Sequence, residues 1–255
     1  MDDFHRKLKD RIDSAVTQDI IIKSRKTALN SIRQKHIALE LQMPLEDYKK
    51  KFRSIKNHAI ANLSHLVDLA TIRLRENGCN VYHANKVQDV LKILDNIIDD
   101  SLVVKCKTNM AKEIRLKEYL ESRKIEIVET DLGDRIVQLS QSHASHPLIP
   151  SLHIPKAQAA KLFHITKDPQ QLTIKEIVNV ARAGLRDIVL KAKISISGAN
   201  AITAEEGLIC LEENEGNQRL ITSLARKHIV LAGIDKVVPT AEDAVRIMKD
   251  AAYYG

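Results

Sequence analysis

The spacing of apolar positions divides the chain into a helical N-terminal third and a mixed remainder. Apolar residues recur at intervals of three and four over residues 2–42, 45–52 and 55–76, which predicts helices in all three segments. Gly78 follows the last segment, and glycine is a common helix stop. We therefore expect an all-helical N-terminal arm over residues 1–77, followed by a domain of a different kind.

Short apolar runs alternate with amphipathic segments from residue 78 onward. The runs predict buried strands, and the segments between them predict helices that cover the strands. The expected strands lie at residues 79–83, 102–105, 125–129, 135–139, 194–197, 208–211, 220–222, 228–232 and 236–238, and the expected helices at 85–98, 111–123, 157–163, 173–190 and 241–252. Thr173 and Glu176 have the spacing of a capping box. The predicted fold class over residues 78–255 is α/β, with a mainly parallel sheet and flanking helices.

Two turns within residues 194–222 form the best candidate for a site. They are Ser197–Asn200 and Asn214–Asn217. Their glycines and asparagines tolerate positive φ and leave backbone N–H groups free for a ligand. The two turns and nearby carboxylates could meet at one sheet edge, with Glu205 as a general base or nucleophile. The predicted binding residues there are Gly198, Asn200, Gly207, Asn214, Glu215, Gly216 and Asn217. The alternative is that both are ordinary hairpin turns.

Three further candidates follow predicted parallel strands. Lys105 and Lys107 come at the end of one strand, and Asp131 comes after the next. Ligands of parallel sheets bind beyond the carboxyl ends of the strands, which gives these residues weight. The lysines could hold an anion such as phosphate, a carboxylate or a CoA-like group, although lysines are also common on any protein surface.

The net charge of +7 is concentrated near the N-terminus. Residues 1–57 carry 14 Lys and Arg against 8 Asp and Glu. Such a segment favours an acidic partner or nucleic acid, but it lacks interleaved aromatic residues, so we expect a solvated helix face and no nucleic acid. No apolar run reaches the roughly 18–20 residues of a membrane span, and the first residues lack a signal-peptide core. We therefore expect a cytoplasmic protein without a membrane span.

The sequence also argues against several kinds of site. No phosphate-binding loop, dinucleotide-binding glycine motif, nucleophile elbow or zincin motif occurs. The three cysteines are single and unspaced, so the chain cannot by itself hold an iron–sulfur cluster or a zinc ion through thiolates. His143, His146 and His153 share a loop with three prolines, and a stiffened surface loop is favoured over a metal site. The predicted site therefore contains no metal and no cofactor.

Five short motifs occur in a fixed order along the chain. They are VVKCKTNMAKEI at 103–114, IEIVETDLGDRIVQL at 125–139, SHPLIPSLHIPKAQAAKLF at 145–163, SISGANAITAEEGLICLEENEGNQRLIT at 195–222 and HIVLAGIDKVVPTAEDA at 228–244. Each is weakly specific alone. Together they resemble the LUD (lactate-utilisation) domain family, and most closely the N-terminal domain of the iron–sulfur subunit of the lactate-utilisation complex. The resemblance covers about residues 60–255.

The resemblance implies a fold similar to the sugar-phosphate isomerase and CoA-transferase group. It also implies a role in oxidising L-lactate to pyruvate within a redox complex, where this domain binds a small organic acid or another subunit. The iron–sulfur clusters would lie in a missing C-terminal segment or a partner subunit. This domain would then be a non-catalytic or accessory part of the complex. Truncation of the domain at its C-terminus and assembly into a homo-oligomer both stay open.

Two other functions stay open as well. One is an enzyme of the CoA-transferase or sugar-phosphate isomerase kind, in which Glu205 reacts and Lys105 with Lys107 holds phosphate or CoA. The other is a structural module that docks through residues 1–57. The chain departs from the family where it reads Glu205–Leu208 in place of the usual E-T-G-T, and this carboxylate-rich turn would repel an anion.

Overall fold

The computed structural model covers most of the chain beyond its N-terminus. It describes residues 45–254 except 101, 147–148 and 169, together with scattered helical residues between Arg6 and Ile37. The helix predicted over residues 2–42 therefore lies mostly outside the described residues.

The chain divides into two compact units. The helical unit contains Met1–Leu41 and Leu132–Arg182, and the sheet unit contains Gln42–Asp131 and Ala183–Gly255. Both β-sheets and every predicted binding residue belong to the sheet unit.

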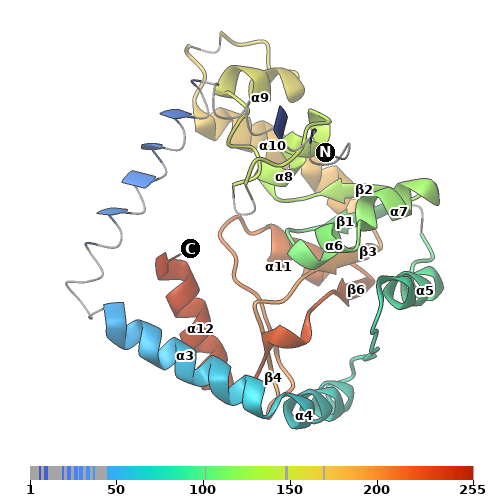
Figure 1. Ribbon diagram of the computed structural model, residues 1–255. Helices are drawn as coiled ribbons and strands as arrows, with labels where there is room; N and C mark the ends of the chain where they lie inside the picture. Colours follow the sequence, from blue (N-terminus) through green and yellow to red (C-terminus); the bar gives the residue numbers. More distant parts are fainter. Residues whose placement is uncertain are drawn as a thin grey trace. The chain divides into compact units, whose positions relative to one another are not determined.

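Four parallel strands form the main sheet, in the order β2-β1-β3-β6 (Figure 1). They are β1 (Leu102–Lys105), β2 (Glu126–Glu129), β3 (Ile194–Ser197) and β6 (Lys227–Val230). Strand β1 pairs with β2 on one side and β3 on the other, so that Lys105 lies opposite Glu129 and Ile196. The predicted parallel sheet of an α/β fold is confirmed.

Helices cover both faces of this sheet because β1 and β2 carry buried apolar side chains on both sides. On one face, Leu94 of α5 (Val87–Ile97), Ala111 of α6 (Asn109–Glu113) and Leu116 of α7 (Leu116–Ser122) pack with the buried strand residues Val103 and Ile127. On the other face, the buried residues Val104, Cys106 and Val128 pack with Val189 of α10 (Ile174–Lys191) and Ile221 of α11 (Asn217–Leu224).

A second, smaller sheet has the strand order β5-β4-β7. It contains β4 (Ala201–Thr203), β5 (Ile209–Cys210) and β7 (Val237–Val238), which follows a short 3₁₀ turn at Ile234–Lys236. Strand β4 runs antiparallel to β5 and parallel to β7. Because β4 starts four residues after β3 ends, the chain passes directly from one sheet to the other.

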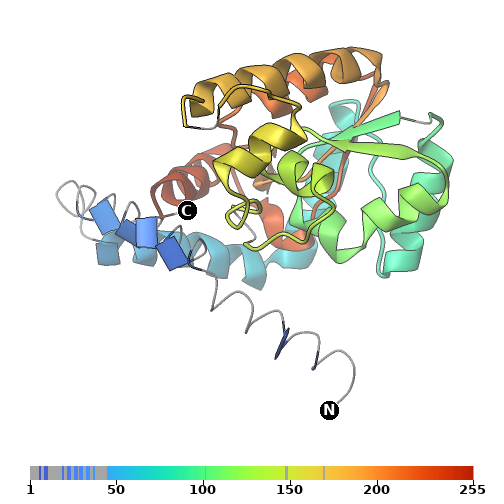
Figure 2. The ribbon, with the colours of Figure 1, turned by 90° about the horizontal axis from the view of Figure 1, so that it is seen from above.

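Three helices pack against the small sheet: α3 (Leu45–Ala61), α4 (Leu63–Glu76) and α12 (Ala241–Tyr254). Ala59, Leu66 and Ala70 form one buried cluster with Ala204 and Val237 of the sheet region. Helices α3 and α12 lie side by side, as both ribbon views show (Figures 1 and 2). The last part of the predicted N-terminal arm therefore packs within the sheet unit.

The helical unit contains α8 (Leu132–Leu139), α9 (Lys156–Leu162) and the first half of α10. Ala160, Leu172 and Ile177 form its small buried core. The predicted capping box at the start of α10 is confirmed: the Thr173 N–H donates to Glu176 Oε2 over 2.7 Å, and the Glu176 N–H donates to Thr173 Oγ1 over 3.3 Å.

Several predicted elements were wrong. The runs at 135–139 and 220–222 were predicted as strands but lie in α8 and α11. Such runs are too short for periodicity to separate a strand from a buried helix face. Residues 79–83 form no strand, and the helix predicted over 111–123 breaks at Arg115, which adopts a left-handed conformation with φ of 54°.

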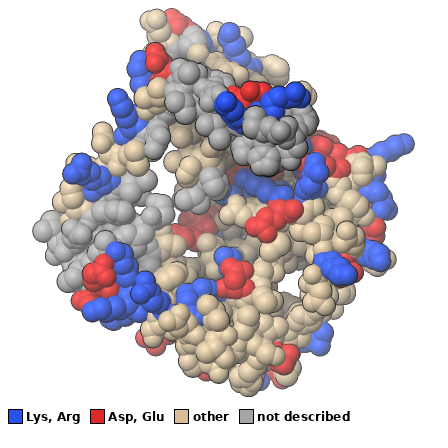
Figure 3. All heavy atoms as spheres, in the orientation of Figure 1, with Lys and Arg blue, Asp and Glu red and all other residues tan. Residues whose placement is uncertain are grey.

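None of the helices in the described part of the chain has both the length and the apolar character needed to cross a membrane. On the face that Figure 3 shows, basic and acidic side chains are interspersed over the described surface.

Gly207 fixes the β4–β5 turn against α4, and this contact generates a stability prediction. Its φ is +65°, and an added Cβ would lie 2.6 Å from the carbonyl carbon of Arg73. We expect Gly207→Ala to lower the free energy of unfolding by about 3 kcal/mol, since strain and overpacking add. Gly78 also has a positive φ, +86°, but open space around its Cβ position, so Gly78→Ala should cost only about 1 kcal/mol. Urea unfolding measures both variants. An equal loss in the free energy of unfolding for Gly207→Ala and Gly78→Ala would contradict the close contact at Gly207.

The capping box generates a prediction about pH. Lys167 and the Thr173 backbone hydrogen-bond to the Glu176 carboxylate and lower its pKa to about 2. The ionised group therefore stabilises the folded state above its ordinary pKa near 4.5, and this contribution is lost as pH falls from there toward about 2. In acid unfolding followed by circular dichroism, Glu176→Gln should lose stability less steeply over this range. Identical acid transitions in the variant and the parent protein would refute the proposed linkage.

Candidate functional site

Most of the predicted site residues lie at the carboxyl ends of the parallel strands. The chain runs from β1 to β2 on one side of β1, whereas the next strand of this sheet, β3, lies on the other side of β1. The boundary between β1 and β3 is therefore a topological switch point. Ligands of open α/β sheets bind at such points, outside the carboxyl ends of the strands. We name this region the carboxyl edge and define it as residues 105–108, 129–131, 197–200 and 216–217.

A buried ion pair lies at the carboxyl edge between β1 and β2. The Nζ atom of Lys105 lies 2.8 Å from Oε2 of Glu129 and donates to the Cys106 carbonyl oxygen over 3.1 Å. Lys105 is only 2% exposed and Glu129 only 8%. Buried charges are stable only when paired and hydrogen-bonded, and parallel register places these two residues directly opposite each other. In this structure the anion at Lys105 is therefore Glu129.

Thr130 connects the two neighbouring strands to the start of α11. Its N–H and its hydroxyl both donate to the Lys105 carbonyl oxygen, over 2.8 Å and 3.0 Å. The Asn217 side-chain amide approaches the Thr130 hydroxyl at 3.5 Å. Asn217 begins α11, and Gly216 before it has a φ of +76°. The structure thus brings the end of the predicted Asn214–Asn217 turn to the carboxyl edge.

Gly198 packs the turn after β3 against the turn after β1. A Cβ on Gly198 would lie 3.0 Å from Oγ1 and 3.1 Å from Cβ of Thr108, so a side chain there would push the turns apart. Asn200, two residues on, is exposed and uses its amide oxygen to accept the Glu212 N–H over 2.9 Å. Glycine at 198 therefore permits the close approach of the two loops that flank the switch point.

The other predicted site residues are divided between two places. Lys107 and Asp131 lie at the carboxyl edge and are partly exposed, and Asn214 and Glu215 are exposed just before α11. Gly207 instead lies in the β4–β5 turn, where the side-chain amide of Asn77, the residue after α4, donates to its carbonyl oxygen over 3.0 Å.

Glu205 also lies in the β4–β5 turn. It is exposed, and its N–H donates to the Pro239 carbonyl oxygen over 3.0 Å. The neighbouring Glu206 carboxylate accepts the Ala241 N–H at the start of α12, which lowers the pKa of Glu206. The β4–β5 turn with Glu205 therefore lies apart from the carboxyl edge, where residues 197–200 and 216–217 of the two predicted turns lie, and its Glu206 carboxylate contacts the start of α12.

The cysteines do not fit an iron–sulfur cluster. The chain has three, whereas a cluster commonly takes four thiolates. Cys79 is exposed after α4, Cys210 is in β5, and Cys106 is fully buried at the carboxyl edge. Burial raises the pKa of the Cys106 thiol to about 11, so it is protonated at neutral pH and is neither a ready nucleophile nor a ready metal ligand.

The histidine loop belongs to the helical unit. His143 and His146 are exposed, and Nε2 of His153 lies 3.1 Å from the Ser142 hydroxyl. Burial lowers the pKa of the His153 imidazole. Across the part of the chain that the structure describes, no three His, Cys, Asp or Glu side chains come together as metal ligands.

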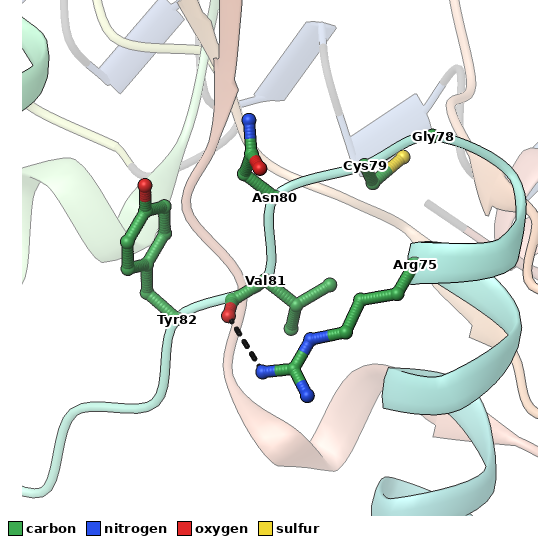
Figure 4. Close-up of a pocket in the computed structure, with 6 residues that line it drawn as sticks. All are labelled: Arg75, Gly78, Cys79, Asn80, Val81 and Tyr82. Carbon is green, nitrogen blue, oxygen red and sulfur yellow. Dashed lines mark hydrogen bonds between the residues drawn. The ribbon is translucent and has the colours of Figure 1, made fainter.

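A hollow of about 500 Å³ lies at the end of α4 and the segment that follows it (Figure 4). It is lined by Arg75, Gly78, Cys79, Asn80, Val81 and Tyr82. The Arg75 guanidinium donates to the Val81 carbonyl oxygen over 3.2 Å, which holds the loop to α4. The sequence predicted a strand here and gave no sign of a cavity.

Two residues at the carboxyl edge were missed as site residues by sequence reasoning. Glu129 and Thr108 are buried there, and only the three-dimensional structure reveals their neighbours. Glu129 had one sequence signal, a polar residue at the end of an apolar run, and we weighed that signal for Lys105 but not for Glu129.

These features define an α/β protein with a candidate site at the carboxyl edge of a parallel sheet, and comparison with known proteins specifies its family. The model of the LUD domain matches residues 67–255, so the chain belongs to the LUD domain family. The family resemblance read from the sequence is thereby confirmed.

Named relatives cover nearly the whole chain. Lactate utilization protein B of Oceanobacillus iheyensis is 30% identical over 240 residues, which span 92% of this chain and 50% of that protein. Lactate utilization protein B of Bacillus subtilis is 30% identical over 238 residues, with 91% and 50% covered. The uncharacterized electron transport protein YkgF of Escherichia coli is 28% identical over 247 residues, with 93% and 50% covered. The chain thus spans about half the length of these relatives. No solved structure matches it.

The buried ion pair generates a prediction about stability. Lys105→Met leaves the Glu129 carboxylate buried without its cation, so we expect a loss of about 3–5 kcal/mol in the free energy of unfolding. The double variant Lys105→Met/Glu129→Leu should recover most of that loss, because it removes both buried charges. Urea unfolding of the two variants measures this coupling. A single variant as stable as the parent, or a double variant no better than the single, would show that the pair is not coupled.

Proposed function

We propose that this chain is the LUD-domain part of a cytoplasmic redox assembly that oxidises L-lactate to pyruvate, and that its carboxyl edge binds the small organic acid. Two findings support the role: membership of the LUD domain family and relatives named for lactate utilization and electron transport. One observation carries the choice of site. At the carboxyl edge of the parallel sheet, Lys107 follows β1 and Asp131 follows β2, the Asn217 amide approaches Thr130, and the Gly198 turn packs against Thr108.

The chemistry of a 2-hydroxy acid fits the side chains at this edge. Its carboxylate needs cationic or N–H donors, which Lys107, the Asn217 amide and the backbone of the Gly198 turn would supply. Its hydroxyl needs an acceptor, which the Asp131 carboxylate would supply. The Lys105–Glu129 pair joins β1 and β2, the strands that precede Lys107 and Asp131, and so fixes where these two residues begin.

In this proposal the electron-transfer groups are held elsewhere. Because the cysteines of the chain do not fit an iron–sulfur cluster, the clusters would belong to the rest of a longer protein or to another subunit. The domain would then bind and orient the acid while partner subunits accept its electrons. A second copy of the chain could also take part in such an assembly.

The alternative of a CoA-transferase or isomerase-like enzyme requires Glu205 and Lys105 to act on one ligand. Glu205 is exposed in the β4–β5 turn, whereas Lys105 is buried in the main sheet and paired with Glu129. We therefore favour the organic-acid site at the carboxyl edge, to which Glu205 contributes nothing.

Calorimetric titration tests the proposed function. We expect the protein to bind L-lactate or pyruvate, and Lys107→Gln to weaken that binding about tenfold or more, because a hydrogen bond to a charged group contributes about 1.5–3 kcal/mol. Lys92→Gln removes the same charge from an exposed position on α5 and serves as the matched control, with no change in affinity. Glu205→Gln should also bind normally.

Three outcomes would count against this function. They are no binding of either acid, equal losses in the Lys107→Gln and Lys92→Gln variants, and binding of an acyl-CoA or sugar phosphate that Glu205→Gln abolishes. The last of these would support the enzyme alternative instead.

A further inference from the structure

A histidine bridges two serines on the face of the main sheet that α10 and α11 cover. Ser195 lies opposite His228 in the register of β3 and β6. The Ser195 hydroxyl oxygen lies 2.7 Å from His228 Nδ1, and the Ser197 hydroxyl oxygen lies 2.9 Å from His228 Nε2. Both serines have no exposed surface. These three polar side chains share a face with the aliphatic residues Val104 and Val128, and the proposed organic-acid site does not use them.

The direction of every hydrogen bond in this group follows from one carbonyl. The Ser197 hydroxyl lies 2.9 Å from the Gly198 carbonyl oxygen, which can only accept, so Ser197 donates to it. The Ser197 oxygen is then free to accept from Nε2–H of His228. A neutral ring with its proton on Nε2 leaves Nδ1 as an acceptor, and Ser195 donates to it.

The surroundings favour the neutral ring. His228 is half-buried, and burial lowers the pKa of its imidazole below the ordinary value. The result is a chain of donors that runs one way, from Ser195 through His228 and Ser197 to the carbonyl of Gly198. Such chains strengthen each member by mutual polarisation.

This chain ends at a residue that matters for the carboxyl edge. Gly198 packs against Thr108 across the switch point, and its carbonyl direction sets the direction of the peptide N–H that follows. We infer that His228, acting through Ser197, is a positioning residue that holds the turn at residues 198–200 in its ligand-binding geometry. The ligand part of this inference rests on the proposed function, whereas the hydrogen-bond chain does not. His228 touches no ligand in this role and is not a catalytic residue.

Two serine variants separate positioning from simple burial of polar groups. Ser195→Ala and Ser197→Ala each remove one buried hydroxyl from β3, but only Ser197→Ala cuts the link to Gly198. His228→Gln keeps an N–H donor and an acceptor near the two ring nitrogen positions, and His228→Leu keeps neither.

The first measurement is the protonation state of the His228 imidazole in the unmodified protein. Nitrogen-15 NMR at neutral pH should show a neutral His228 with its proton on Nε2. A proton on Nδ1, or a doubly protonated ring, would overturn the inference even if every variant failed to fold.

The second readout is amide hydrogen exchange at residues 198–200. We expect exchange to rise about tenfold in Ser197→Ala and His228→Leu, and to change less than about threefold in Ser195→Ala and His228→Gln. The affinity for L-lactate should fall in the same order. Equal changes of the exchange rate in Ser195→Ala and Ser197→Ala would show that the serines only stabilise the sheet, and would overturn the inference. If L-lactate fails to bind the parent protein, the proposed function fails, while the ring proton and the exchange rates still decide the role of His228.

Discussion

The parallel register of β1 with both of its neighbours is the constraint on which the rest of this structure depends. It places Lys105 opposite Glu129, so that two charges can be buried together, and it aligns the ends of three strands at one edge. Successive residues of β1 and β2 face opposite sides of the sheet, so each side carries buried apolar side chains, and helices cover both. A change in register by one residue would turn Lys105 toward the opposite face and separate the pair.

The direct connection from β3 to β4 also determines where the candidate site residues lie. Because the chain leaves the main sheet at Gly198 and enters a second sheet at Ala201, the carboxylates around Glu205 are carried to the helices that pack on β4 and β7. The turn that stays at the carboxyl edge is fixed twice, by contact with Thr108 and by the hydrogen bond from Ser197. The two ends of this glycine-rich stretch therefore lie at different places, residues 198–200 at the carboxyl edge and residues 205–207 against α4 and α12.

Sequence patterns predicted what depends on local order. The strand at 102–105 and the capping box of Thr173 with Glu176 need only neighbouring residues, and both are confirmed. The runs 135–139 and 220–222 were wrong because three to five apolar residues fit a helix face as well as a strand. The burial of Lys105 and the bridge through His228 depend on residues 24 and more than 30 positions away, which no local pattern reports.

The most direct test of the central claim, an organic-acid site at the carboxyl edge, is backbone amide NMR during titration with L-lactate. We predict shifts concentrated at Lys107, residues 130–131, residues 198–200 and Asn217, with the hollow at residues 78–82 unaffected. Shifts confined to that hollow or to the β4–β5 turn, or no shifts at all, would contradict the assignment of the site to the carboxyl edge.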